Sequence, residues 1–307
     1  MTESVEAIVA RFPKSFLVGV ATSGHQVEGG NEHSDWWEFE TLAGSECGEP
    51  SGNAVEHFTR YPEDIALFAR LGYTAYRFSI EWARIEPTEG EFDVAMLDHY
   101  RRVTATCREH GIFPMVTLNH FSIPAWLWRR GGWTSPEAPE LFRRFVAKAS
   151  RALAGVAGAF CTLNEPNLPM SAFYDRHGER FHRVGGVEMP FPMCHAHEAR
   201  DQQLKAHKWA VEAVREHTSI PVGMSLNLHE HVAKEGGEAQ LAKIQNECED
   251  VFLEAARGDD FVGVQNYGRK LVGPEGVLKW EGDLDFLGYD YAPNLSLIHI
   301  SEPTRPY

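Results

Sequence analysis

The sequence predicts an α/β protein built as an incomplete (β/α)8 TIM barrel, with about six of its eight strand–helix units present. Short apolar runs alternate with longer segments of helical periodicity, a pattern typical of a parallel sheet covered by helices. Polar side chains stand at or just after almost every apolar run. A barrel gathers such strand ends around one rim, whereas an open doubly wound sheet concentrates them at one switch point. The segment after the first apolar run also lacks the G-x-G-x-x-G motif of a phosphate-binding loop, since its Gly29-Gly30 pair is too short to form one.

Strands and helices are predicted in strict alternation. The predicted strands are 16–21, 75–80, 113–118, 160–163, 221–226 and 261–265. The predicted helices are 62–71, 93–110, 139–153, 194–217 and 239–257. Pro62 is expected to open the first of these helices, with Glu63 and Asp64 at the positive end of its dipole, and Gly72 is expected to end it.

The domain organisation is simple. Residues 1–294 are interpreted as one partial barrel, because neither an internal repeat nor a low-complexity linker divides them. The final stretch, 295–307, reads LSLIHISEPTRPY and looks like the translation of a sequencing-library adapter. We interpret it as a non-native tail outside the fold.

The composition indicates a sizeable core and an acidic surface. The 307 residues are 43% hydrophobic and carry 29 Lys and Arg against 44 Asp and Glu, a formal charge of −15. This charge disfavours nucleic acid and anionic membranes as partners, and it suits a neutral small-molecule substrate. No apolar run approaches the roughly 18 residues of a membrane span, and 1–11 lacks the apolar region of a secretory signal. The sequence gives no indication of the oligomeric state.

Cysteine usage indicates a reducing compartment, so we expect a cytoplasmic location. The 5 cysteines are odd in number and form no C-x-x-C motif, which argues against a disulfide framework and a structural zinc site. His195 and His197 look like metal ligands, but an i, i+2 spacing on a helix points them to different faces. We therefore expect no metal ion and no cofactor.

The most informative motif is Thr162-Leu163-Asn164-Glu165-Pro166, at the end of the fourth predicted strand. Pro166 biases Glu165 away from helical backbone angles, so its side chain should be held at the strand end and reach the barrel mouth. Acid-catalysed glycoside cleavage needs a carboxyl group that protonates the leaving oxygen. A strand-end glutamate taken alone is more often a solvated surface residue, so the assignment of Glu165 as general acid depends on its surroundings.

Those surroundings resemble glycoside hydrolase family 1, the β-glucosidase family. The matching stretches are FPKSFL (12–17), GVATS (19–23), QVEGG (26–30), YRFSIEWARI (76–85), TLNHF (117–121) with Pro124 and Trp126-Leu127, NEP (164–166) and QNY (265–267). They follow the family's order and spacing from Phe12 to about Gly276.

The resemblance implies a fold, an activity and a set of site residues. It implies a retaining, exo-acting β-glycosidase that acts on small β-glucosides or β-galactosides. Gln26 and His120 would bind hydroxyls of the terminal sugar, and Asn164 its 2-hydroxyl. The catalytic residues that it implies are Glu165 as general acid/base, Arg77 and Tyr267 to keep the nucleophilic carboxylate ionised, and Asn266 to support them.

Each supporting residue also has a simpler interpretation. Arg77 could be a surface cation, Gln26 a loop cap, His120 a core histidine and Tyr267 a rim aromatic. The family's nucleophilic glutamate, in a Thr-Glu-Asn-Gly type motif, has no counterpart here. The sequence therefore leaves two alternatives open: an inactive fragment that binds sugar, and an endo-acting relative with the same Asn-Glu-Pro arrangement.

Overall fold

The computed structural model describes residues 12–13, 15–43, 45, 47–175, 183–184, 187–192, 195–280 and 282–284. The predicted tail 295–307 and the predicted helix start at Cys194 lie outside these ranges. Among the described helices, none is long and apolar enough to cross a lipid bilayer.

Six parallel strands form the main sheet, in the order β1-β2-β3-β4-β7-β9. Their bounds are β1 Gly19–Ala21, β2 Ala75–Ser79, β3 Phe113–Asn119, β4 Ala159–Asn164, β7 Val222–Asn227 and β9 Phe261–Gln265. Every strand pairs in parallel with the next. Each coincides with a predicted strand, although β1 begins three residues later than the predicted start at Phe16. The predicted barrel architecture, with six strands in place, is therefore confirmed.

Burial explains why these strands read as apolar runs. All residues of β4 and β7 are buried, because helices cover one face and the barrel interior the other. At the edge of the sheet, β9 alternates between half-buried and exposed residues, with Val262 and Val264 outward. The edge strand therefore shows which of its side chains face inward.

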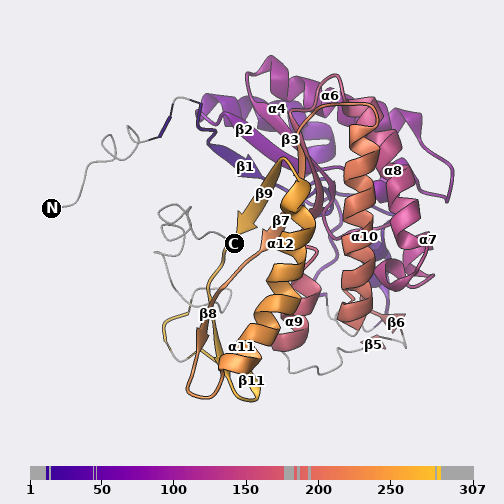
Figure 1. Ribbon diagram of the computed structural model, residues 1–307. Coiled ribbons are helices and arrows are strands. Elements are labelled where there is room, and N and C mark those ends of the chain that lie inside the picture. Colours follow the sequence, from indigo (N-terminus) through magenta and orange to yellow (C-terminus); the bar gives the residue numbers. More distant parts are fainter. Residues whose placement is uncertain are drawn as a thin grey trace.

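Helices cover the outer side of the sheet (Figure 1). The long ones are α4 His57–Arg70, α6 Val94–Glu109, α8 Ala138–Leu153 and α10 Ala196–Arg215, followed by α11 Glu238–Gln245 and α12 Val251–Ala255. Shorter helices occupy loops, at α2 Gly24–Val27, α3 Asp35–Thr41, α5 Trp82–Ile85, α7 Ala125–Trp128, α9 Leu168–Asp175, and the 3-10 turns Gly132–Thr134 and Ala256–Gly258. Helices that follow one another around the barrel contact each other, α4 with α6, α6 with α8 and α8 with α10.

Two helix predictions needed correction. Helix α4 begins at His57, five residues before the predicted start, and Pro62 lies inside it. The helix begins before Pro62 because the buried His57 ring is hydrogen-bonded through Nδ1 to Asp64 Oδ2 at 2.7 Å and through Nε2 to the Tyr76 hydroxyl at 3.0 Å. These contacts offset the backbone hydrogen bond lost at the proline. The predicted helix 239–257 is likewise not uniform, since a π-helical turn, Asn246–Asp250, separates α11 from α12. Gly72, with φ of 86°, does follow the end of α4 as expected.

Large aromatic side chains fill the layer between helices and sheet. Trp82 stacks on Phe145 with ring centroids 5.1 Å apart, and both are almost fully buried. Phe142 packs against the same indole at 5.5 Å. This core joins the end of β2 to α8 and so fixes where the strand ends lie.

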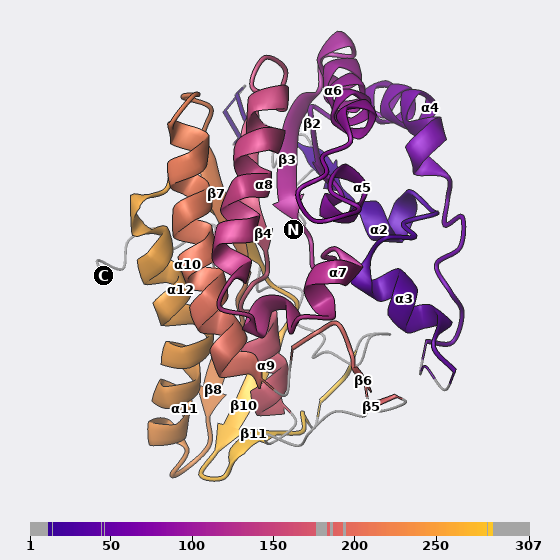
Figure 2. The same cartoon turned by 90° about the vertical axis from the view of Figure 1, so that its right-hand side faces the viewer.

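Two small sheets lie outside the barrel. One contains β8 Glu230–Ala233, β10 Arg269–Gly273 and β11 Gly276–Leu278, and the other pairs β5 Arg183–Val184 with β6 Val187–Glu188. Figure 2 shows β8, β10 and β11 beside α9 and α11, beyond the carboxyl ends of the barrel strands. Their mixed composition carries no clear strand period, so the sequence did not predict them.

Candidate active site

A cavity of about 260 Å³ opens at the carboxyl ends of the barrel strands. Its lining includes six residues that the sequence singled out: Gln26, Arg77, His120, Asn164, Glu165 and Tyr267. They come from elements spread over the whole sheet, from the turn after β1 to the segment after β9. Parallel strands deliver their carboxyl ends to the same rim, which explains this convergence.

Glu165 follows the last residue of β4 and is 5% exposed. Its φ is 48°, so the residue before Pro166 avoids the right-handed helical region, as expected, but adopts the left-handed rather than the extended conformation. The Glu165 amide donates to Ser225 O at 2.7 Å, and its carbonyl accepts from Leu168 at 3.0 Å, where α9 begins. The backbone is thus fixed on both sides of the carboxyl-bearing residue.

A register shift between β4 and β7 prepares this conformation. The shift lies between Cys161 and Asn164. Regular alternation would send side chains three positions apart to opposite faces of a sheet. Here Cys161 Sγ and Asn164 Oδ1 both contact Ser225 Oγ, at 3.6 and 3.1 Å, so both face the interior. The irregularity brings Asn164 into the cavity.

Asn164 is held by donors from three strands. Its Oδ1 accepts hydrogen bonds from Arg77 Nη2 on β2, Ser225 Oγ at 3.1 Å and Gln265 Nε2 at 2.9 Å. Arg77 Nη1 also donates to Ser225 Oγ at 3.2 Å. Because three donors converge on the oxygen, the orientation of the Asn164 amide is settled and its Nδ2 must donate elsewhere.

That donor meets His120. Asn164 Nδ2 lies 3.2 Å from His120 Nε2, so the ring nitrogen accepts and the proton of the neutral imidazole belongs on Nδ1. Burial, with a smaller contribution from the Arg77 charge, lowers the pKa of His120 to about 3. His120 is therefore neutral near pH 7, and its buried Nδ1 has no hydrogen-bond partner among the described residues. The Nδ1–H of His120 is therefore available to donate a hydrogen bond to a ligand hydroxyl.

The protonation of Glu165 is set by opposing influences. Burial raises the pKa of its carboxyl above the ordinary value, while a hydrogen bond from Asn227 Nδ2 at 3.3 Å, the Arg77 charge and the Tyr267 hydroxyl lower it. Burial prevails, so the pKa remains raised. A raised pKa keeps the proton on the carboxyl group closer to neutral pH, as a general acid requires.

Comparison with known proteins assigns the chain to a family. The family model for glycosyl hydrolase family 1 matches residues 8–264. The chain belongs to glycosyl hydrolase family 1. It is 35% identical over 243 residues to a β-glucosidase of Agrobacterium sp., an alignment that covers 76% of this chain and 51% of the relative. The chain thus spans about half the length of that curated relative.

Solved glycosidase structures share the fold. The crystal structure of β-glycosidase BGL167 superposes with a TM-score of 0.83 at 44% identity, covering 91% of this chain and 72% of that one. The family 1 β-glucosidase of Thermotoga maritima, solved with isofagomine lactam, superposes with a TM-score of 0.79 at 26% identity, covering 92% and 73%.

Not every predicted residue lies in the cavity of this family 1 chain. Asn266 is not among the lining residues, whereas its neighbour Gln265 is. The side chains of β9 alternate and Gln265 lies on the inward face, while the supporting role expected for Asn266 stays a prediction. Tyr267 lies at the rim, 45% exposed.

Sequence reasoning also missed Ser225 and Asn227. Both lie on β7 two positions apart, so they share a face, and both are almost fully buried. Polar residues at alternate positions of an otherwise apolar strand are the signal that could have identified them.

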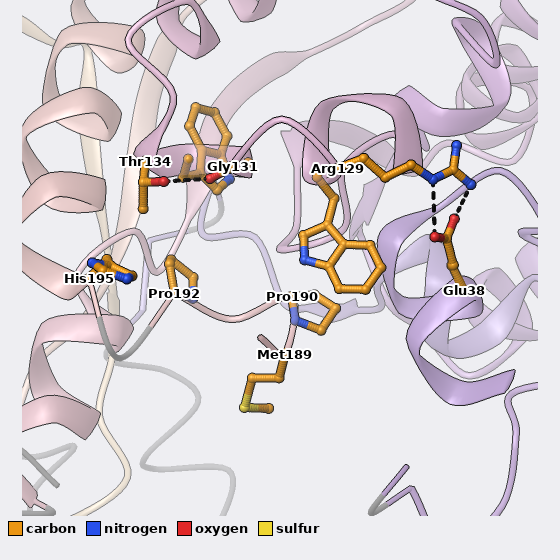
Figure 3. A pocket seen from close by; sticks show the side chains of 11 residues that line it. Glu38, Arg129, Gly131, Thr134, Met189, Pro190, Pro192 and His195 are labelled. Carbon is orange, nitrogen blue, oxygen red and sulfur yellow. Dashed lines mark hydrogen bonds and ion pairs between the residues drawn. The ribbon is translucent and has the colours of Figure 1, made fainter. Parts of the chain in front are cut away.

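A larger cavity elsewhere in this family 1 chain lacks the same chemistry. It measures about 450 Å³ and lies beside α7, and its lining also includes Met189, Pro190 and His195 (Figure 3). Its carboxylate, Glu38, accepts from Arg129 Nε at 3.1 Å, and Thr134 Oγ1 donates to Gly131 O at 2.7 Å. This carboxylate is paired with an arginine, whereas the other cavity holds the buried Glu165 carboxyl with its raised pKa beside His120 Nδ1, which has no partner among the described residues, so we place the candidate active site at Glu165.

Two further features bear on the chemistry of the Glu165 cavity. Glu165 is the only carboxylate among its described lining residues. Within the part of the chain that the structure describes, no three His, Cys, Asp or Glu side chains come together to hold a metal ion. The cavity therefore presents one acid and several hydrogen-bond donors.

Proposed function

We propose that this protein is a retaining, exo-acting β-glycosidase that hydrolyses terminal β-linked glucose- or galactose-type residues by double displacement. The observation that carries the proposal is the buried Glu165 carboxyl, with its raised pKa, in one cavity with Asn164, His120 and Gln26. The β-glucosidases to which the chain is similar support the substrate class.

The proposed roles follow from the contacts. Glu165 protonates the leaving oxygen in the first step and removes a proton from water in the second. Asn164 binds the sugar 2-hydroxyl, a contact that strengthens in the transition state. Gln26 and His120 bind the remaining hydroxyls, as befits a pocket closed around one terminal sugar.

A retaining mechanism needs a second carboxylate about 5–5.5 Å from the first. Since Glu165 is the only carboxylate among the described lining residues, we propose that the nucleophile comes from a part of the protein outside this chain. The Arg77 guanidinium and the Tyr267 hydroxyl would keep it ionised. Arg77 supports this assignment, because its buried Nε has no hydrogen-bond partner among the described residues. The 307-residue chain by itself would bind a glycoside without turning it over.

The same proposal covers organisation and location. Residues 1–294 would form one partial barrel with 295–307 as a non-native tail. The four cysteines described here, Cys47, Cys107, Cys161 and Cys248, are free, which supports a reducing, cytoplasmic compartment.

The test replaces Glu165 by glutamine in the full-length protein. For glycosides with poor leaving groups, Glu165→Gln should lower kcat/KM by about 10²–10⁴-fold, because the leaving oxygen loses its proton donor. Aryl glycosides with good leaving groups should lose far less at the glycosylation step. Glu63→Gln, at a glutamate whose side chain is 70% exposed, is the matched control.

Three outcomes would count against the proposal. Full activity of Glu165→Gln on poor leaving groups would remove the acid assignment. Turnover by the 307-residue chain alone would show that no outside nucleophile is needed. Activity confined to polysaccharides would favour an endo-acting hydrolase over an exo-acting one.

A further inference from the structure

We propose that Asn167 is a positioning residue for Glu165, because it ties the end of β7 to the π-helical turn Asn246–Asp250 and thereby holds Asn227 against the acid. The inference rests on the proposed function and adds a residue that touches neither the cavity nor a substrate. Asn167 is fully buried and lies two positions after Glu165 in the chain.

The side chain of Asn167 behaves like an added segment of strand. Its Nδ2 donates to Asn227 O at 2.6 Å, and its Oδ1 accepts from Asn227 N at 3.0 Å. This reciprocal pair continues the hydrogen bonding between β4 and β7 past the point where Glu165 leaves the sheet. One amide group thus fixes both backbone polar groups of Asn227.

The second Nδ2 hydrogen of Asn167 reaches the π-helical turn. It donates to Cys248 O at 2.9 Å, so Asn167 uses both donor hydrogens and its acceptor. A π turn is wider than an α turn and leaves carbonyl groups outside the regular helical ladder, and such turns are frequent at functional sites. A uniform α-helix over 239–257 would not present Cys248 O in this way.

The π turn holds the end of β7 at a second point. Glu249 Oε1 accepts from His229 N at 2.9 Å, two residues beyond Asn227. The turn therefore contacts the chain through Asn167 before the strand end and through Glu249 after it.

The last link runs from Asn227 to the acid. Asn227 is 4% exposed, and its Nδ2 donates to Glu165 Oε2 at 3.3 Å. This hydrogen bond favours the ionised carboxylate and opposes the effect of burial. The other titratable or charged side chains that line the cavity are Arg77, His120 and Tyr267, and the hydrogen bonds of the Asn167 side chain go instead to Asn227 and Cys248. Removing the Asn167 contacts that hold Asn227 should therefore change the pKa of Glu165 and not that of the other three groups.

The experiment compares pH profiles in the full-length protein. Asn167→Ala should raise the pKa of the basic limb of kcat/KM by about one pH unit, the amount expected for one hydrogen bond to a charged group. It should also lower kcat/KM about ten-fold for poor leaving groups and much less for good ones. Ser150→Ala, which removes a buried 2.6 Å hydrogen bond inside α8, should leave the limb unmoved.

A second variant tests the link itself and does not depend on Asn167→Ala folding. Asn227→Ala should move the basic limb in the same direction, and the double variant should move it no further than Asn227→Ala alone. An unmoved limb in either single variant, or additive shifts in the double variant, would overturn the positioning role. If instead Glu165→Gln retained full activity on poor leaving groups, the proposed function itself would fail, and the two failures are thereby distinguished.

Discussion

Replacing Tyr100 by phenylalanine should destabilise the protein by an amount that grows with pH. Tyr100 is 1% exposed and its hydroxyl has two partners. It donates to Glu28 Oε2 at 2.9 Å and accepts from Glu81 N at 3.2 Å. Glu28 directly follows α2, the short helix that carries Gln26, so this buried contact supports one wall of the candidate active site.

The magnitude follows from what Tyr100→Phe removes. A hydrogen bond to an ionised group contributes about 1.5–3 kcal/mol, and a buried N–H left without a partner costs about 1–3 kcal/mol. Because the two effects overlap at one hydroxyl, the free energy of unfolding should fall by about 3 kcal/mol when Glu28 is ionised. When Glu28 is protonated the first contribution shrinks, and about 2 kcal/mol remains.

The sign of the pH dependence comes from Glu28. Burial raises its pKa to about 7, partly offset by the Arg84 charge and the Tyr100 hydrogen bond. The folded state thus holds the Glu28 proton more tightly than the unfolded chain does, and stability falls as pH rises from about 4.5 to about 7. Without the Tyr100 hydroxyl, the folded-state pKa of Glu28 rises further. In the variant, the titration of Glu28 therefore continues to lower the stability above pH 7. In the wild type, this contribution of Glu28 is already complete near pH 7.

The assay is urea unfolding of the full-length protein at pH 6 and pH 8.5, with m-values compared between variants. The loss of stability should be about 1 kcal/mol larger at pH 8.5. Tyr61→Phe is the matched control, since the Tyr61 ring packs on His99 at 5.4 Å while its hydroxyl bonds no described residue. A loss that is equal at both pH values, or larger at pH 6, would refute the assigned coupling between Tyr100 and Glu28.

Two further substitutions test the fold beneath the site. Gly24→Ala would place a Cβ 2.5 Å from Glu81 Oε1 and 2.8 Å from Glu81 Cγ, so Glu81 must move, and with it the wall of the cavity formed by α2, which carries Gln26. The KM for aryl glycosides should therefore rise several-fold. An unchanged KM would show that this wall does not contribute to binding. Phe145→Ala would remove a fully buried ring that stacks on Trp82, and the free energy of unfolding measured in urea should fall by about 3–5 kcal/mol. A fall of less than about 1 kcal/mol would mean that the core collapses to fill the space.

The main sheet was predictable because each of its strands has a strong local signal. Inner strands such as β4 are buried on both faces, so they appear as uninterrupted apolar runs between helical segments. The start of α4 was not predictable, because His57 joins the helix through contacts with Asp64 and Tyr76 that are not encoded in local propensity. The π turn after Gln245 was not predictable for the same reason, since the buried carbonyl of Cys248 accepts its hydrogen bond from another segment.

The site was predictable where a polar residue directly follows an apolar run. Asn164 and His120 stood out on that criterion, and both line the cavity. Ser225 was overlooked because it lies inside a run that is otherwise apolar. Gln265 was overlooked because only the register of β9 shows that its side chain, one position before Asn266, faces inward. Strand ends therefore indicate where a barrel site lies, but only the register shows which residue enters it.

Backbone strain supports the placement of the site at Glu165 independently of any side-chain role. Among the described non-glycine residues, Ala54, Glu56, Phe121 and Glu165 have positive φ, and the last two line the same cavity. The left-handed region costs a residue with a Cβ about 1–2 kcal/mol, so it persists only where surrounding contacts enforce it. At Glu165 the enforcing contacts are the bonds to Ser225 O and from Leu168 N. Rotation about the Glu165 N–Cα bond leaves the Glu165 amide in place, so an extended Glu165 would keep the bond to Ser225 O but lose the bond from Leu168 N. It would also send its side chain in another direction, so the strained backbone determines where the carboxyl points.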